Sequence, residues 1–258
     1  MLTRTYLVVG LLTLLHILAW FAVALVEKRN DVADVAWGCG FLIAGLGSFL
    51  LNGAAVDRGL LVTGLVSIWA LRLSRHIFRR NRGKDEDPRY AAWRREWGRW
   101  FVVRSFVQVF ILQWVLMLLV SLPVLIVNVR RGGPPTPFDL LGVAVWAFGF
   151  VFEAAADRQL RRFTRDPVNR GALLRTGLWR YSRHPNYFGE VVQWWGLALI
   201  ALSVPGGVWG TVGAAVITLL ILKVSGIPLL EARLALKPGY ADYAATTSAF
   251  VPLPPRRR

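Results

Sequence analysis

Long apolar stretches separated by short polar ones dominate the chain, and their lengths predict membrane-spanning helices. A helix needs about 20 residues to cross roughly 30 Å of hydrocarbon, and seven stretches approach that length. They cover residues 5–26, 35–52, 59–77, 102–127, 138–156, 187–204 and 207–227. Strand-length segments of alternating polarity are absent, and only a helix or a closed barrel satisfies its backbone in lipid. The pattern predicts an all-α integral membrane bundle of seven transmembrane helices, in one domain over residues 1–258.

Composition supports a membrane protein. Of the 258 residues, 55% are hydrophobic and only 18% are charged, and the mean hydropathy is +0.46. These values exclude an ordinary soluble domain and a disordered tail. Cys39 is the single cysteine, so the chain cannot form an internal disulfide. Without a cluster of Cys and His, we expect no metal site.

The basic residues predict an orientation. Lys and Arg outnumber Asp and Glu by 31 to 15, yet their positions argue against nucleic-acid binding. Arg4, Arg58, Arg130 and Arg131 fall on one side of the membrane, and the other 27 fall on the opposite side. Since cytoplasmic loops carry the excess of Lys and Arg, we expect the N-terminus outside and the C-terminus in the cytoplasm, in a bacterial inner membrane.

The two longest cytoplasmic segments, 72–104 and 157–185, are longer than bundle connections require. Functional groups tend to lie in such loops, so we expect the chemistry on this side. Trp93, Trp97 and Trp100 share one helical face, which is typical of an interfacial helix. Arg72 and Arg75 lie at the inner end of a membrane helix, where charge is costly unless it faces a polar cavity.

Asp157 and Arg161 allow two interpretations. Spaced i, i+4, they can form an intrahelical ion pair. Together with Arg165 they can instead form an anion site, because guanidinium groups bind phosphates bidentately. Arginine greatly outnumbers lysine in both long segments, and this favours phosphate recognition.

A polar stripe enters the sixth apolar stretch. Pro185 is suited to the first turn of a helix, so Asn186, Glu190 and Gln193 follow on one face. Hydrogen bonding between helices explains Asn and Gln in a membrane, but it explains an ionisable Glu less well. The stripe therefore predicts a cavity or a polar partner.

Three separated segments, in order, resemble the bacterial branch of the steroid 5-alpha-reductase family. They are residues 79–90, with Arg79-Arg80-Asn81-Arg82-Gly83-Lys84-Asp85-Glu86-Asp87-Pro88-Arg89-Tyr90, residues 183–190, with Arg183-His184-Pro185-Asn186-Tyr187-Phe188-Gly189-Glu190, and the tail 240–252. The related isoprenylcysteine carboxyl methyltransferases share the Arg-His-Pro-x-Tyr element. The resemblance covers nearly the whole chain, and the half from about residue 138 carries most of the cofactor motif.

This resemblance implies a membrane reductase that uses NADPH to reduce the double bond of 3-oxo-Δ4 steroids. It places Asn186 and Glu190 at the nicotinamide half, Asp157 and Arg161 at the adenosine and phosphate portion, and Asn81 and Arg82 in a loop near the cofactor. To the same cofactor site we assign Arg72, Arg75, Arg165, Arg183, His184, Tyr187, Tyr240 and Tyr243. His184, before a proline, can instead have a structural role.

The family's Gln-Glu pair and its third-span tyrosine, which bind the enone carbonyl, have no obvious counterparts here. At the corresponding depth stand Asp31, Asp34, Trp37 and Trp69, and we take the two tryptophans as substrate contacts. Hydride addition to an enone builds charge on its oxygen, so the site needs a proton donor. Asp34 is our first candidate, followed by Asp31 and Glu190, although Asp34 can also serve as a helix N-cap.

Three functions remain open at this level. The first is the NADPH reductase, acting on a steroid or another enone lipid, as a monomer or weak oligomer in contact with membrane lipid. The second is an S-adenosylmethionine-dependent methyltransferase of the isoprenylcysteine type. The third is a non-enzymatic membrane protein that docks anionic lipid. The arginine excess favours the first over the second, and the buried polar stripe argues against the third.

Overall fold

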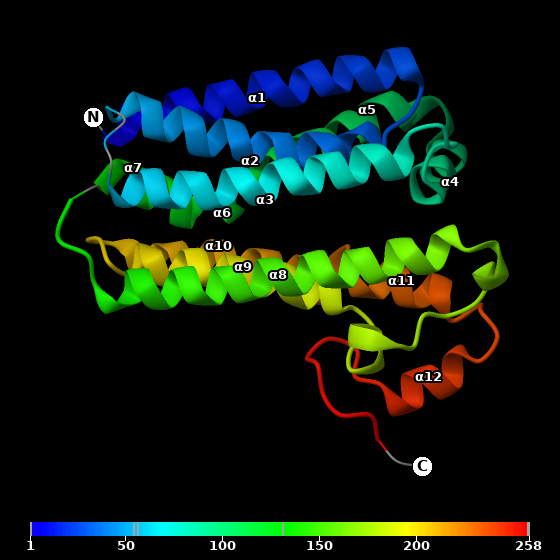
Figure 1. The fold of residues 1–258 in the computed structure, drawn as a ribbon. Coiled ribbons are helices and arrows are strands. Elements are labelled where there is room, and N and C mark those ends of the chain that lie inside the picture. Colours follow the sequence, from blue (N-terminus) through cyan, green and yellow to red (C-terminus); the bar gives the residue numbers. More distant parts are fainter. Residues whose placement is uncertain (1, 54, 56, 131, 257–258) are drawn as a thin grey trace. The chain divides into compact units, whose positions relative to one another are not determined.

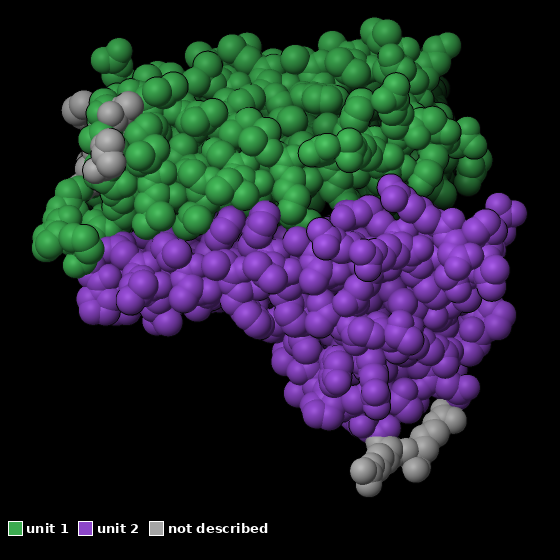
Figure 2. Space-filling view, viewed as in Figure 1, with its two compact units in different colours: residues 1–135, 201–213 green, residues 136–200, 214–258 purple. Residues whose placement is uncertain are grey.

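The computed structural model describes residues 2–53, 55, 57–130 and 132–256. In these residues the regular elements are all helical, and the only β pairing is an isolated bridge between Ser182 and Ser248. Figure 1 shows the order of the helices. They group into two compact units, residues 1–135 with 201–213 and residues 136–200 with 214–258, which Figure 2 colours green and purple. Each unit is described by itself below.

Unit 1 holds seven of the labelled α-helices. They are α1 (Leu2–Glu27), α2 (Val32–Leu51), α3 (Arg58–Asn81), α4 (Pro88–Trp97), α5 (Phe101–Ser105), α6 (Leu112–Val120) and α7 (Leu122–Arg130). A 3-10 turn, Gly98–Trp100, joins α4 to α5, and a π-helical segment, Phe106–Ile111, joins α5 to α6. Another 3-10 turn, Gly207–Trp209, precedes α10 (Gly210–Leu219), which starts in this unit and continues into the other.

Unit 2 contains the remaining helices. They are α8 (Pro137–Arg165), α9 (Pro185–Ala201), whose last residue belongs to unit 1, α11 (Ile227–Leu234) and α12 (Tyr240–Thr246). Two 3-10 turns, Pro167–Asn169 and Gly177–Arg180, lie between α8 and α9. A π-helical segment, Leu220–Val224, continues α10 toward α11.

Six helical stretches of the described residues are long and apolar enough to cross a membrane, which indicates an integral membrane protein. They are Thr3–Glu27, Val32–Leu51, Arg58–Asn81, Pro88–Val120, Pro137–Arg165 and Gly207–Leu234. The remaining predicted span, 187–204, corresponds to α9, which has 17 residues against the roughly 20 that a membrane helix needs. The count of seven therefore stays a prediction.

The expectation of long inner loops is wrong in part. Helix α3 continues to Asn81, α4 begins at Pro88 and α8 continues to Arg165. Only residues 82–87 remain as a loop in the first segment. Arginine favours helix, and its long side chain carries the charge away from an apolar helix axis, so polarity here does not end the helices.

Glycines bring α8 and α9 close together within unit 2. A Cβ on Gly149 would lie 2.6 Å from the carbonyl oxygen of Gly189, and one on Gly196 would lie 2.7 Å from the backbone nitrogen of Trp146. Small residues allow such close helix contact in membranes. The contact buries the side chains of Glu153 and Gln193, whose Oε2 and Nε2 atoms are 2.6 Å apart.

Candidate functional site

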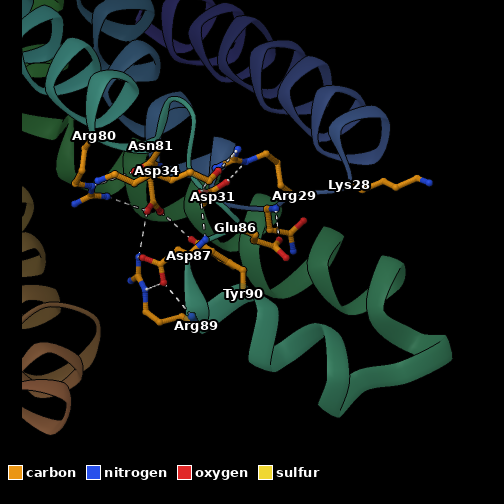
Figure 3. A network of polar contacts seen from close by, with 12 residues as sticks. Lys28, Arg29, Asp31, Asp34, Arg80, Asn81, Glu86, Asp87, Arg89 and Tyr90 are labelled. Carbon is orange, nitrogen blue, oxygen red and sulfur yellow. Dashed lines mark hydrogen bonds and ion pairs between the residues drawn. The ribbon is translucent and has the colours of Figure 1, made fainter. Parts of the chain in front are cut away.

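A group of charged side chains lies where four segments of unit 1 meet, and we call it the ionic cluster (Figure 3). The segments are the turn between α1 and α2, the start of α2, the end of α3, and residues 84–94. Pro88 occupies the first turn of α4, and the Asp87 carboxylate caps this helix by accepting a 2.9 Å hydrogen bond from the backbone nitrogen of Arg89. The members of the cluster are Arg29, Asp31, Asp34, Arg80, Glu86, Asp87, Arg89, Tyr90 and Arg94.

Asp31 is held by Arg29 in a bidentate ion pair. Both donor–acceptor distances are 2.7 Å, and the backbone nitrogen of Asp87 also donates to Asp31, at 3.3 Å. Hydrogen bonding to Asp31 raises the pKa of the Arg29 guanidinium. Asp31 as a whole residue is 2% exposed. Such a fully engaged acceptor is a weak candidate for a proton donor.

Asp34 lies in the first turn of α2, while Asp31 takes the N-cap position without making a capping hydrogen bond. The Tyr90 hydroxyl donates to Oδ1 of Asp34 at 2.8 Å. On the other oxygen, Arg89 Nη2 donates at 3.2 Å, and Arg80 Nη2 lies 3.9 Å away. Both oxygens of Asp34 therefore accept hydrogen bonds, and Tyr90 supplies the hydroxyl proton of the pair.

Glu86 is a carboxylate of the ionic cluster that was not among the candidate site residues from the sequence. It accepts hydrogen bonds from the backbone nitrogen of Asn30 at 2.6 Å and from Arg94 at 3.0 and 3.1 Å. Arg94 also donates to the carbonyl oxygen of Lys28 at 2.8 Å. These bonds fasten the α1–α2 turn to α4. The sequence feature that could have identified Glu86 is the acidic run Asp85-Glu86-Asp87, which lies among many arginines.

The loop residues Asn81 and Arg82 lie next to the ionic cluster. Arg80 Nε donates to the side-chain oxygen of Asn81 at 3.1 Å, whereas the Asn81 Nδ2 atom is buried without a hydrogen-bond partner. Arg82 is exposed. Gly83 has a φ of +71°, which favours glycine. Arg72 and Arg75 lie on α3, about two to three turns before this loop.

The two predicted substrate tryptophans flank one phenylalanine. The ring centroid of Phe41 is 5.0 Å from that of Trp37 and 5.3 Å from that of Trp69, both in edge-to-face geometry. Trp69 is buried and Trp37 is half-buried. The fold thus assembles an aromatic wall from α2 and α3.

In unit 2, the segment before α9 is organised by Glu231, a residue of α11. Arg183 forms a bidentate ion pair with Glu231, with distances of 2.7 and 3.0 Å, and His184 Nε2 lies 2.7 Å from the same carboxylate. Burial lowers the pKa of His184, and the hydrogen bond to Glu231 only partly offsets this effect. Arg183 and His184 are thus engaged within the protein.

Asn186, Tyr187 and Glu190 follow on the first turns of α9. The rings of His184 and Tyr187 stack at 5.8 Å, while Glu190 is buried and Asn186 is half-buried. On α8, Asp157 is buried, and Arg161 and Arg165 are exposed. The structure therefore keeps these predicted residues together in one unit.

The two tail tyrosines are buried against the segment before α9. The Tyr243 hydroxyl donates to the carbonyl oxygen of Trp179 at 2.5 Å. Burial and the nearby Glu231 carboxylate raise the pKa of Tyr240 to about 12. The Tyr243 bond holds α12 against the 3-10 turn Gly177–Arg180.

An open pocket of about 420 Å³ lies beside Tyr243. Its lining includes Arg175, Arg180, Thr246 and Thr247. Arg175 and Arg180 were absent from the sequence-based candidates, although both belong to a basic segment. Across the part of the chain that the structure describes, no group of three His, Cys, Asp or Glu side chains is placed to hold a metal ion.

Comparisons with known proteins place the chain in a family. A family model described as "Protein of unknown function (DUF1295)" matches residues 20–247. The chain is 37% identical to 3-oxo-5-alpha-steroid 4-dehydrogenase 1 of Mus musculus over 73 residues, which is 28% of this chain and 29% of the mouse protein. The human protein of the same name is 38% identical over 71 residues, 27% of each chain.

A longer match is with the uncharacterized protein C594.04c of Schizosaccharomyces pombe, at 28% identity over 195 residues, 66% of this chain and 54% of that protein. The matched regions span between about a quarter and about half of the lengths of these relatives. No solved structure matches the chain.

Proposed function

Because the chain belongs to the DUF1295 family and part of it is similar to mammalian 3-oxo-5-alpha-steroid 4-dehydrogenases, we propose that it is an NADPH-dependent membrane reductase. Its proposed substrate is a 3-oxo-Δ4 steroid or a similar enone lipid. The observation that carries the proposal is the face of α9 on which Asn186 and the buried Glu190 follow the anchored Arg183-His184 pair.

The residues present fit an anionic dinucleotide. Arg175 and Arg180 line the open pocket of unit 2, and Arg161 and Arg165 are exposed on the last turns of α8. Guanidinium groups suit phosphates because they donate two parallel hydrogen bonds. Asn186 and Glu190 would hold the nicotinamide half of the cofactor. NADPH would supply the hydride.

For the proton, Asp34 stays our first choice. Its two oxygens are contacted by Arg89 and by the Tyr90 hydroxyl, and a protonated carboxyl can accept such bonds while it keeps one proton to donate. We therefore assign proton donation toward the enolate oxygen to Asp34 in its protonated form, with Tyr90 and Arg89 orienting the carboxyl group. Asp31 and Glu190 are the lower-ranked candidates. Trp37 and Trp69, whose rings contact Phe41 edge to face, would form an apolar wall for the ring system.

The proposal includes an arrangement in the membrane. Helix α9 would be the seventh span, with the N-terminus outside and the C-terminus in the cytoplasm. The ionic cluster and the segment before α9 would then belong to the inner side, where 27 of the Lys and Arg residues fall. The protein would act as a monomer or weak oligomer.

Thermal unfolding of the detergent-solubilised protein tests the cofactor. A ligand that binds only the folded state raises the unfolding temperature by mass action. We expect NADPH at about 100 times its Kd to stabilise the protein by roughly 2.7 kcal/mol, and S-adenosylmethionine to leave it unchanged. Stabilisation by S-adenosylmethionine alone would identify a methyltransferase instead.

A further inference from the structure

Glu231 connects three parts of unit 2 that are distant in sequence. It lies on α11 and binds Arg183, 48 residues earlier, and His184, 47 residues earlier. Arg183 in turn donates to the carbonyl oxygens of Ala244 at 3.0 Å and Thr247 at 2.5 Å. One carboxylate thus joins the last apolar helix, the segment before α9 and the C-terminal helix α12.

Backbone contacts continue this connection on both sides of Arg183. The backbone nitrogen of Arg183 donates to the carbonyl oxygen of Ser248 at 2.8 Å, and Ser182 Oγ donates to that of Phe250 at 2.8 Å. Ser182 Oγ also accepts from the backbone nitrogen of His184 at 3.1 Å. The tail therefore lies along residues 182–184 as a strap.

The strap determines where α9 starts. The carbonyl oxygen of His184 accepts the hydrogen bond of the Phe188 backbone nitrogen at 3.1 Å, and the His184 ring stacks on Tyr187. Fixing His184 therefore fixes the first turn of α9, which carries Asn186 and leads to Glu190. A buried charge requires a partner of opposite charge. For the Arg183 guanidinium, this partner is the Glu231 carboxylate.

We propose that Glu231 is a positioning residue, which holds Arg183 and His184 so that the first turns of α9 present Asn186 and Glu190 to the cofactor. This inference rests on the proposed function for the identity of the cofactor only. Glu231 also lies against Tyr240, and it acts on α9 through Arg183 and His184.

The test compares Glu231→Gln with wild type in two measurements. Glutamine keeps the shape of the side chain but removes its charge, and Glu96→Gln, at an exposed position of α4, is the matched control. The first measurement, without cofactor, is amide hydrogen exchange of residues 182–190 and 240–250. We expect exchange at least about tenfold faster in both segments of Glu231→Gln, since loss of a charge-assisted hydrogen bond changes an opening equilibrium by about that factor, and unchanged exchange in Glu96→Gln.

The second measurement is the Kd for NADPH in a double-mutant cycle with Asn186→Ala. We expect Glu231→Gln to raise Kd at least about tenfold. We also expect this effect to shrink in the Asn186→Ala background, because residues that act through one another are not additive. A side chain with a merely structural role would lower the unfolding temperature but leave the Kd of the folded protein unchanged.

The outcomes separate the two proposals. Unchanged exchange in residues 182–190, or an unchanged or fully additive NADPH Kd, overturns the positioning role. If wild type does not bind NADPH, the proposed function fails, and the positioning role is then decided by the exchange measurement alone.

Discussion

The Tyr90 hydroxyl donates a 2.8 Å hydrogen bond to Asp34 although 56 residues separate the two in the sequence. Tyr90 is 4% exposed, and Arg89, the residue before it, binds the other oxygen of the same carboxylate. A carboxyl group held by these two residues has a fixed direction, which is what proton donation to a developing enolate requires.

Removal of the Asp34 carboxyl proton tests this role. We expect Asp34→Asn to lower kcat for progesterone reduction, followed as NADPH oxidation, by at least about 10²-fold, the usual size of a general-acid contribution. NADPH affinity should stay nearly the same. Asp85→Asn, the same change at an exposed aspartate, is the control. A near wild-type kcat in Asp34→Asn would move the role of acid to Asp31 or Glu190.

Cofactor contacts are tested by truncation. Asn186→Ala and Arg161→Ala should each weaken NADPH binding by roughly 1.5–3 kcal/mol, as expected when a charge-assisted contact is removed. Isothermal titration of folded protein gives both the affinity and the stoichiometry. If neither variant changes the affinity, the cofactor lies elsewhere, and the same titration with S-adenosylmethionine decides the alternative.

The close contact of α8 and α9 predicts a steric effect. Gly149→Ala places a Cβ 2.6 Å from the carbonyl oxygen of Gly189 and 2.8 Å from the backbone nitrogen of Gln193, so we expect a loss of about 1–3 kcal/mol. Gly64→Ala is the matched control, because a Cβ at that position of α3 meets nothing within 4 Å. Thermal unfolding in detergent compares them, and equal unfolding temperatures would contradict the packing.

His184 predicts a dependence on pH. Burial lowers its pKa in the folded state, so the unfolded chain binds the proton first. This contribution to stability is complete above the unfolded pKa of about 6.5 and is lost as the pH falls below that value toward the folded pKa. Its charged neighbours are Glu231 and Arg183. Between pH 7.5 and 5.5, the unfolding temperature of wild type should fall more than that of His184→Gln; parallel curves would refute the assignment.

The orientation predicts the location of the C-terminus. With 27 of the 31 Lys and Arg residues on one side of the predicted membrane, we expect a C-terminal fusion to be active with a cytoplasmic reporter and silent with a periplasmic one. Fusions after Asn52 and after Gly133 should give the opposite result. A C-terminal fusion active only in the periplasm would reverse the topology.

How much of this follows from the sequence depends on the range of the interactions. Hydropathy over about 20 residues is a local property, so most of the apolar helices were predicted close to their observed bounds. The stretch 102–127 is instead divided among α5, a π-helical segment, α6 and α7, and the extent of the inner loops was also wrong. Helical spacing likewise placed Asn186 and Glu190 one turn apart. The count of seven spans is the weakest of these predictions, because α9 is short.

Contacts between distant segments decided the rest. In the sequence, Asp31 and Asp34 are two similar carboxylates near the start of one helix. In the folded protein, Asp31 binds Arg29, whereas Asp34 binds Tyr90 and Arg89. Glu231 carried no signal at all, because its partners lie 47 and 48 residues away. The type of a side chain determines which hydrogen bonds and ion pairs it can form. Its actual partners are determined by the segments that folding brings next to it.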